Sequence, residues 1–252
     1  MARSDGAARG GAGRTYAGAS TRPLHILVFL APLIVLYELG ATIYLAKVAR
    51  GVDTIGARGI LASIFESLGV ASLHIPPIAL TVVLLLWHII LRDPWRVRPR
   101  VVLGMAAESA LWSIPLLVFS LLLARGVPAA GTETTFADFP WQAKLTVSLG
   151  AGIYEELLFR LLLITGLHFI LVDLLRVPER WAFILAGTAS AVAFALYHNV
   201  RGPGGTLDTR LAFFYAGAGA YFALLFINRG FGIVVATHAI YDVIALLAFD
   251  KS

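Results

Sequence analysis

Two adjacent carboxylates and an arginine lie inside a long apolar run. The segment Glu155-Glu156-Leu157-Leu158-Phe159-Arg160 has apolar sequence on both sides. A single charge at the centre of a membrane helix costs at least about 2.5–3.5 kcal/mol. Three ionisable groups this close together must therefore face a polar or protein-lined interior, where they could take part in chemistry.

Helical geometry separates the two carboxylates. Glu156 and Arg160 are four residues apart and share one helix face, which favours an ion pair. Glu155 lies about 100° round the helix, so it stays free to face a cavity. Two close carboxylates beside one cation in a low dielectric are expected to have different pKa values. This is one way to make a base that works near neutral pH. The alternative is a structural ion triad that only holds helices together.

Further polar residues lie deep in apolar sequence downstream. His198 follows Phe194 by four residues near the end of an apolar segment, where a lone histidine could also be interfacial. His238 and Asp242 are again four apart on one helix face. The carboxylate could orient the imidazole or could only stabilise the helix. The three groups are on separate segments, and they would best be satisfied by meeting in one polar cavity.

The elements that carry these residues are predicted to span a membrane. Apolar residues make up 59% and charged residues 14% of the 252-residue chain, against about 45–50% and 25% in soluble domains. The apolar residues gather in blocks long enough to cross the bilayer. The composition predicts an all-α, polytopic transmembrane helical bundle of about seven to eight spans. The predicted spans are Leu24–Ala46, Ile75–Leu91, Val101–Ala124, Trp141 to about Gly166, Trp181–Val200, Leu211–Ile227 and Phe231–Phe249.

The remaining segments have simpler predictions. Residues 1–22 are expected to form a disordered, basic tail, and residues 23–252 a single membrane domain with a catalytic core at about 141–249. An amphipathic stripe near residues 58–72 predicts a helix lying in the membrane interface, with a further span as the alternative. The segment Leu167–Leu175 could continue the fourth helix, re-enter the membrane or belong to an eighth span.

Charge and cysteine content limit the function classes. The net charge of +5 is attributed to Lys and Arg in cytoplasmic loops, with no nucleic acid as partner. Eight cationic residues in the tail and after the second span against three in the first connection predict a cytoplasmic N-terminus. They are Arg3, Arg9, Arg14, Arg22, Arg92, Arg96, Arg98 and Arg100, against Lys47, Arg50 and Arg58. The absence of cysteine excludes disulfides, thiolate zinc sites and a cysteine nucleophile.

The order and spacing of the three groups resemble the CPBP family of CAAX proteases and bacteriocin-processing membrane proteins, also called type II CAAX prenyl endopeptidase-like proteins. The family pattern is EExxxR, then FxxxH, then HxxxN or HxxxD on successive helices. Its positions are filled here by Glu155, Glu156 and Arg160, by Phe194 and His198, and by His238 and Asp242. The resemblance covers about residues 141–249.

The resemblance implies a role for each matching residue. Glu155 would be the principal catalytic carboxylate, and His198 would help it to activate water. His238 and Asp242 would stabilise the oxyanion, with Glu156, Arg160 and Phe194 in support. Many members have asparagine where this chain has Asp242. An ionised carboxylate cannot donate to an oxyanion, so Asp242 either stays protonated or only orients His238.

The implied activity is an intramembrane endopeptidase acting on prenylated or other membrane-associated peptides. A mechanism without a cofactor is favoured, and zinc held by Glu155, His198 and His238 is the alternative. The rival functions are a proton-coupled transporter and a catalytically silent immunity or scaffold protein. One difficulty is depth: His198 ends its span and His238 begins a parallel one, a mismatch of about 10–15 Å unless the spans are shifted, tilted or broken.

Overall fold

The computed structural model describes residues 15–45, 55–67, 69, 75–123, 139–201 and 205–248, which are helical apart from short connections and one isolated bridge between Arg201 and Leu207. The N-terminal elements are α2 (Tyr16–Ser20), α3 (Pro23–Gly40), the π-helical turn η1 (Ala41–Leu45), α5 (Gly56–Ser67), α6 (Ile75–Leu91) and α7 (Pro99–Leu123). The C-terminal elements are α8 (Trp141–Glu156), η2 (Leu157–Ile164), α9 (Thr165–Phe169), η3 (Ile170–Leu174), α10 (Glu179–Tyr197), α11 (Thr209–Arg229) and α12 (Phe231–Ala248). The predicted helical bundle is confirmed.

The apolar blocks of the sequence become the long helices. In the described residues five helices are long and apolar enough to cross a membrane, and α6 and α12 are shorter apolar helices. Large apolar side chains on their outer faces are exposed, such as Leu122 at 80% and Ile90 at 76%. Such a surface is expected where lipid is the solvent. The segment Leu167–Leu175 continues the fourth helix, which runs without a break from Trp141 to Leu174 through η2, α9 and η3.

Local chemistry sets the helix ends near the site. Asp208 caps α11 by accepting hydrogen bonds from the backbone N–H groups of Arg210 and Leu211. Helix α11 ends at Gly230, whose φ of 84° is readily available only to glycine. The next residue, Phe231, already begins α12. A single residue therefore joins α11 to α12, and the two helices lie against each other.

The most extensive contact between helices in the described residues is that of α8 with α12. Gly152 permits it: a Cβ atom at this position would lie 2.8 Å from the backbone nitrogen of Ala239 and 2.9 Å from the carbonyl oxygen of Val235. Small residues allow this close approach in membrane proteins, where packing rather than solvent drives association. The helix with Glu155 is thus packed directly on the helix with His238.

The N-terminal segment differs from the predicted tail where it is described. Residues 1–14 lie outside the described residues, but Tyr16–Ser20 form α2, capped by the side chain of Thr15. The hydroxyl of Tyr16 donates to Glu108 of α7. Burial and the neighbouring Glu108 carboxylate raise the pKa of Tyr16 to about 12, so the hydroxyl remains a donor.

The start of α3 and the connection between α6 and α7 lie at the same end of the bundle. Arg22 pairs with Asp93 at 3.6 Å, and the backbone N–H of Arg98 donates to His25 Nε2 at 3.2 Å. Two of the cationic groups that predicted the orientation therefore share one side of the protein. That this side is cytoplasmic stays a prediction. A helix is present at the predicted place as α5, at Gly56–Ser67, and its position in the membrane interface stays a prediction.

Candidate active site

Glu155 and Glu156 are the last two residues of α8, where the helix widens into the π-helical turn η2. Such turns are rare and occur often at functional sites. The side chains of Glu156 and Arg160 are fully buried, and Glu156 Oε2 lies 3.2 Å from Arg160 Nε. The predicted ion pair is confirmed. Arg160 Nη2 also donates to the carbonyl oxygen of Gly219 at 3.2 Å, which ties the pair to α11.

Aromatic rings enclose the arginine. The guanidinium carbon lies 4.4 Å from the ring centre of Phe194 and 5.4 Å from that of Phe222. The ring faces attract a cation that has been removed from water. Phe194 of α10 thus supports Arg160 directly.

His198 lies directly after α10 with an extended backbone. Its Nδ1 lies 2.8 Å from the carbonyl oxygen of Phe194, so Nδ1 carries the proton and donates it to that bond. Nε2 then faces Glu155 Oε2 at 3.7 Å. This distance is too long for a direct hydrogen bond and suits a pair of groups that share a water molecule. Glu155 Oε2 is buried and makes no hydrogen bond within the described part of the chain.

His238 is held by Glu156 rather than by its predicted partner alone. Its Nδ1–H donates to Glu156 Oε1 at 2.7 Å, and its Nε2 lies 3.5 Å from Asp242 Oδ2 and 3.9 Å from Glu155 Oε2. Sequence reasoning missed this role of Glu156, because 82 residues separate it from His238. Glu156 therefore joins Arg160 to His238, and its two oxygens have different partners.

Two rings of α11 stack on the two histidines. Tyr215 stacks on His198 with ring centres 4.1 Å apart, and Phe222 stacks on His238 at 4.5 Å. This role of α11 was not predicted from the sequence. The two aromatic residues are seven apart, which places them two turns apart on one helix face, and this spacing could have indicated that they face a common site.

Residues 137–244 match the family model described as type II CAAX prenyl endopeptidase Rce1-like. The chain carries an Rce1-like domain. The match agrees with the predicted core at about residues 141–249. Comparisons with curated proteins and with solved structures gave no match.

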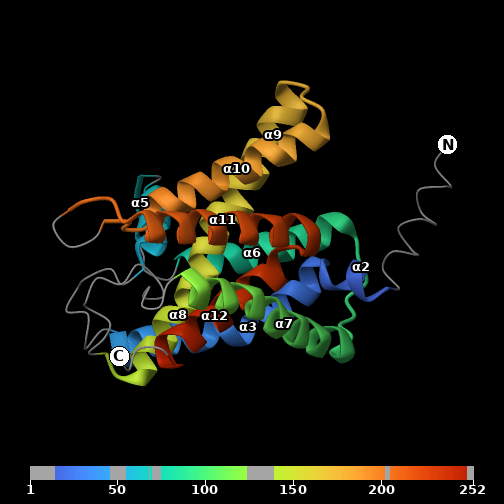
Figure 1. The fold of residues 1–252 in the computed structure, drawn as a ribbon. Coiled ribbons are helices and arrows are strands. Elements are labelled where there is room, and N and C mark those ends of the chain that lie inside the picture. Colours follow the sequence, from blue (N-terminus) through green and yellow to red (C-terminus); the bar gives the residue numbers. More distant parts are fainter. Residues whose placement is uncertain are drawn as a thin grey trace.

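The Rce1-like domain brings the three predicted groups together. The nearest nitrogens of His198 and His238 both lie within 4 Å of Glu155 Oε2, so the expected depth mismatch does not occur. Helix α10 runs obliquely to α11 (Figure 1). Glu155, His198, His238 and Asp242 are all buried.

The distances within the site differ from those of a tetrahedral zinc site. Zinc ligands at 2.0–2.2 Å in a tetrahedral site have donor atoms roughly 3.3–3.5 Å apart. The distances from Glu155 to the two histidines, 3.7 and 3.9 Å, are longer. Among the residues that the structure describes, no group of three or more His, Asp or Glu side chains could hold a metal ion. The side chains as they stand do not form a zinc site, and metal independence stays a prediction.

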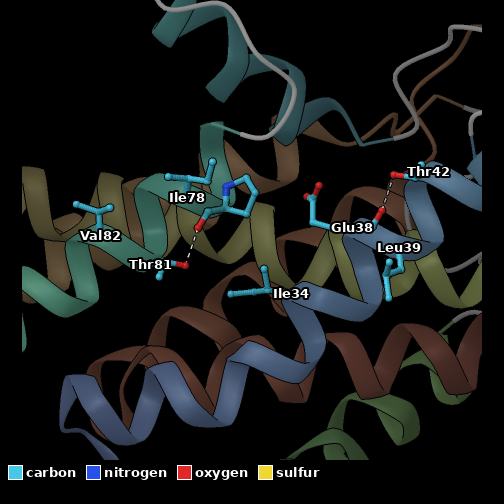
Figure 2. A pocket seen from close by; sticks show the side chains of 8 residues that line it. Ile34, Glu38, Leu39, Thr42, Ile78, Thr81 and Val82 are labelled. Carbon is cyan, nitrogen blue, oxygen red and sulfur yellow. Dashed lines mark hydrogen bonds between the residues drawn. The ribbon is translucent and has the colours of Figure 1, made fainter. Parts of the chain in front are cut away.

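Two other carboxylates lie within apolar helices, and both have partners. Glu108 of α7 pairs with Arg229 of α11, whose Nη2 lies 2.8 Å from Glu108 Oε2. Glu38 accepts a hydrogen bond from Tyr154 at 3.0 Å. Figure 2 shows Glu38 between α3 and α6, where it lines an apolar groove of about 450 Å³. One carboxylate of α3 therefore lies at a groove outside the Glu155 site.

Proposed function

We propose that this protein is an intramembrane endopeptidase in which Glu155 activates water for the hydrolysis of a peptide bond. The observation that supports it best is the position of Glu155 Oε2 between the Nε2 atoms of His198 and His238, at 3.7 and 3.9 Å. A water-activating site needs a base, a group that shares the proton and a donor for the oxyanion. A structural ion pair would need only Glu156 and Arg160.

In the proposed mechanism each group has one task. Glu155 takes a proton from a water molecule whose other proton is directed to His198 Nε2, and the water oxygen bonds to the substrate carbonyl carbon. When its ring carries a second proton, His238 can direct Nε2–H to the developing oxyanion, while its Nδ1–H stays bonded to Glu156. The tetrahedral intermediate collapses, the C–N bond breaks, and the protonated Glu155 gives its proton to the leaving amine.

The proposed substrate is a membrane-associated peptide with a lipid chain. An apolar cavity of about 660 Å³ extends between α5, α6 and η2, and Leu157, Leu161 and Leu162 contribute to its wall. These residues belong to η2, which directly follows α8. The wall of the cavity therefore begins two residues after Glu155 on the same continuous helix. A prenyl chain is apolar and flexible, and such a cavity would favour its burial.

The test uses purified full-length protein in detergent and labelled peptides with and without a prenylated cysteine. We expect cleavage by the wild type and at least about a thousandfold loss for Glu155→Gln, which keeps the shape of the side chain and removes the base. Leu161→Trp, which narrows the apolar cavity, should raise KM for the prenylated peptide and leave that for the unmodified peptide unchanged. An active Glu155→Gln enzyme would rule out the mechanism.

A further inference from the structure

The proposed catalytic cluster consists of Glu155, His198, His238 and Asp242. It adjoins a small internal cavity between α10, α11 and α12. Its volume is about 10 Å³, and its lining includes His198, Tyr215, His238, Tyr241 and Asp242. A cavity of this size accommodates one water molecule or one substrate oxygen. His238, Tyr241 and Asp242 follow one another at helical spacings of three and one, so they share one side of α12.

This cavity lacks the amide donor that asparagine would supply at position 242. Asp242 is 1% exposed, and its Oδ2 makes no hydrogen bond among the described residues. When ionised, this carboxylate only accepts hydrogen bonds and would repel an oxyanion. A second donor to an oxyanion here, beside the ring of His238, would have to come from another residue that lines the cavity.

Tyr241 has a hydroxyl of the required kind. The residue is 4% exposed, and its hydroxyl oxygen finds no hydrogen-bond partner of good geometry in the part of the chain that the structure describes. Ser120 of α7 is near enough to influence the hydroxyl without meeting that geometry. A buried hydroxyl without a partner costs stability, so this hydroxyl would gain from a hydrogen bond to a group that enters the cavity.

We propose that Tyr241 is a catalytic residue whose hydroxyl donates a hydrogen bond to the oxyanion, in place of the amide that position 242 does not supply. The inference rests on the proposed peptidase function. As the water oxygen bonds to the carbonyl carbon, the π electron pair of the C=O bond moves to the carbonyl oxygen. Tyr241 O–H donates to that oxygen and keeps its proton. When the C=O bond re-forms and the C–N bond breaks, the hydrogen bond is released.

The first test is Tyr241→Phe in the full-length protein, which removes one oxygen atom. Loss of an oxyanion donor lowers kcat by roughly 100- to 1,000-fold, and KM should stay within about twofold. The melting temperature should be unchanged or higher, because the hydroxyl makes no hydrogen bond of good geometry with any residue that the structure describes. A structural role would instead lower the melting temperature and leave kcat intact.

The matched control is Tyr221→Phe on α11. The Tyr221 hydroxyl donates to the carbonyl oxygen of Trp112 at 2.5 Å, outside the catalytic cluster. This variant should keep its kcat and lose a little thermal stability. The same assay at equal protein concentration then separates the loss of a hydroxyl from the loss of an oxyanion donor.

The second test restores a donor at position 242. In the Tyr241→Phe background, Asp242→Asn should recover kcat at least about tenfold, because an amide N–H can donate to the oxyanion. Full activity of Tyr241→Phe, or no recovery in the double variant, would overturn this inference. When the wild type cleaves the peptide and Glu155→Gln does not, the proposed function stands, and either of these two results would count against the role of Tyr241 alone. A wild type that cleaves nothing would overturn the peptidase function, and this inference with it.

Discussion

Replacement of Arg160 by alanine tests the structural basis of the site most directly. The arginine is fully buried, pairs with a fully buried Glu156 at 3.2 Å and contacts the ring of Phe194. Removing it leaves a carboxylate without its cation in a low-dielectric interior, which costs about 3–5 kcal/mol. His238 still donates to the other oxygen of Glu156. We therefore expect the free energy of unfolding to fall by the lower part of that range. The volume that the arginine side chain leaves unfilled should lower it further.

The assay is equilibrium unfolding in mixed micelles of dodecyl maltoside and SDS, followed by tryptophan fluorescence. The control is the double variant Glu156→Gln with Arg160→Met, which removes both charges and keeps the volume. Its stability should lie within about 1.5 kcal/mol of the wild type, because neutral replacement of a buried pair is often tolerated. Arg160→Ala with wild-type stability would refute the reasoning, since Glu156 would then be neutral or hydrated.

Three further expectations follow from the geometry. His198→Ala should lower peptide hydrolysis by at least about a hundredfold with a small change in melting temperature. A large fall in melting temperature that accompanies the loss of hydrolysis would instead indicate a packing role. Gly152→Ala should destabilise the protein by about 1–3 kcal/mol, because its Cβ would lie 2.8 Å from the Ala239 nitrogen. Gly166→Ala, whose Cβ would meet nothing within 4 Å, should be neutral or stabilising. Activity should survive EDTA and dialysis, and a loss that zinc restores, with one bound zinc per chain, would establish a metal mechanism.

Relations within one helix could be predicted from the sequence. The pair of Glu156 and Arg160 depends on a spacing of four residues, and the apolar blocks depend on the thickness of the bilayer. Both are local properties of the chain.

Relations between helices were harder to predict. The Glu156–His238 hydrogen bond joins residues 82 apart, and the Glu108–Arg229 pair joins residues 121 apart. Both depend on helix tilt and rotation, which side-chain packing sets. The convergence of three motifs could be predicted only because each motif contains charges that need partners. The contribution of α11 was missed because aromatic rings carry no such requirement.

The close contact of α8 and α12 has a mechanical consequence. Backbone atoms of the two helices meet at Gly152, so the elements carrying Glu155 and His238 behave as one stiff body. His198 directly follows α10, which contacts this body mainly through η2 and α11. Lateral pressure in the bilayer would therefore leave the Glu155–His238 distance nearly constant and act on the Glu155–His198 distance.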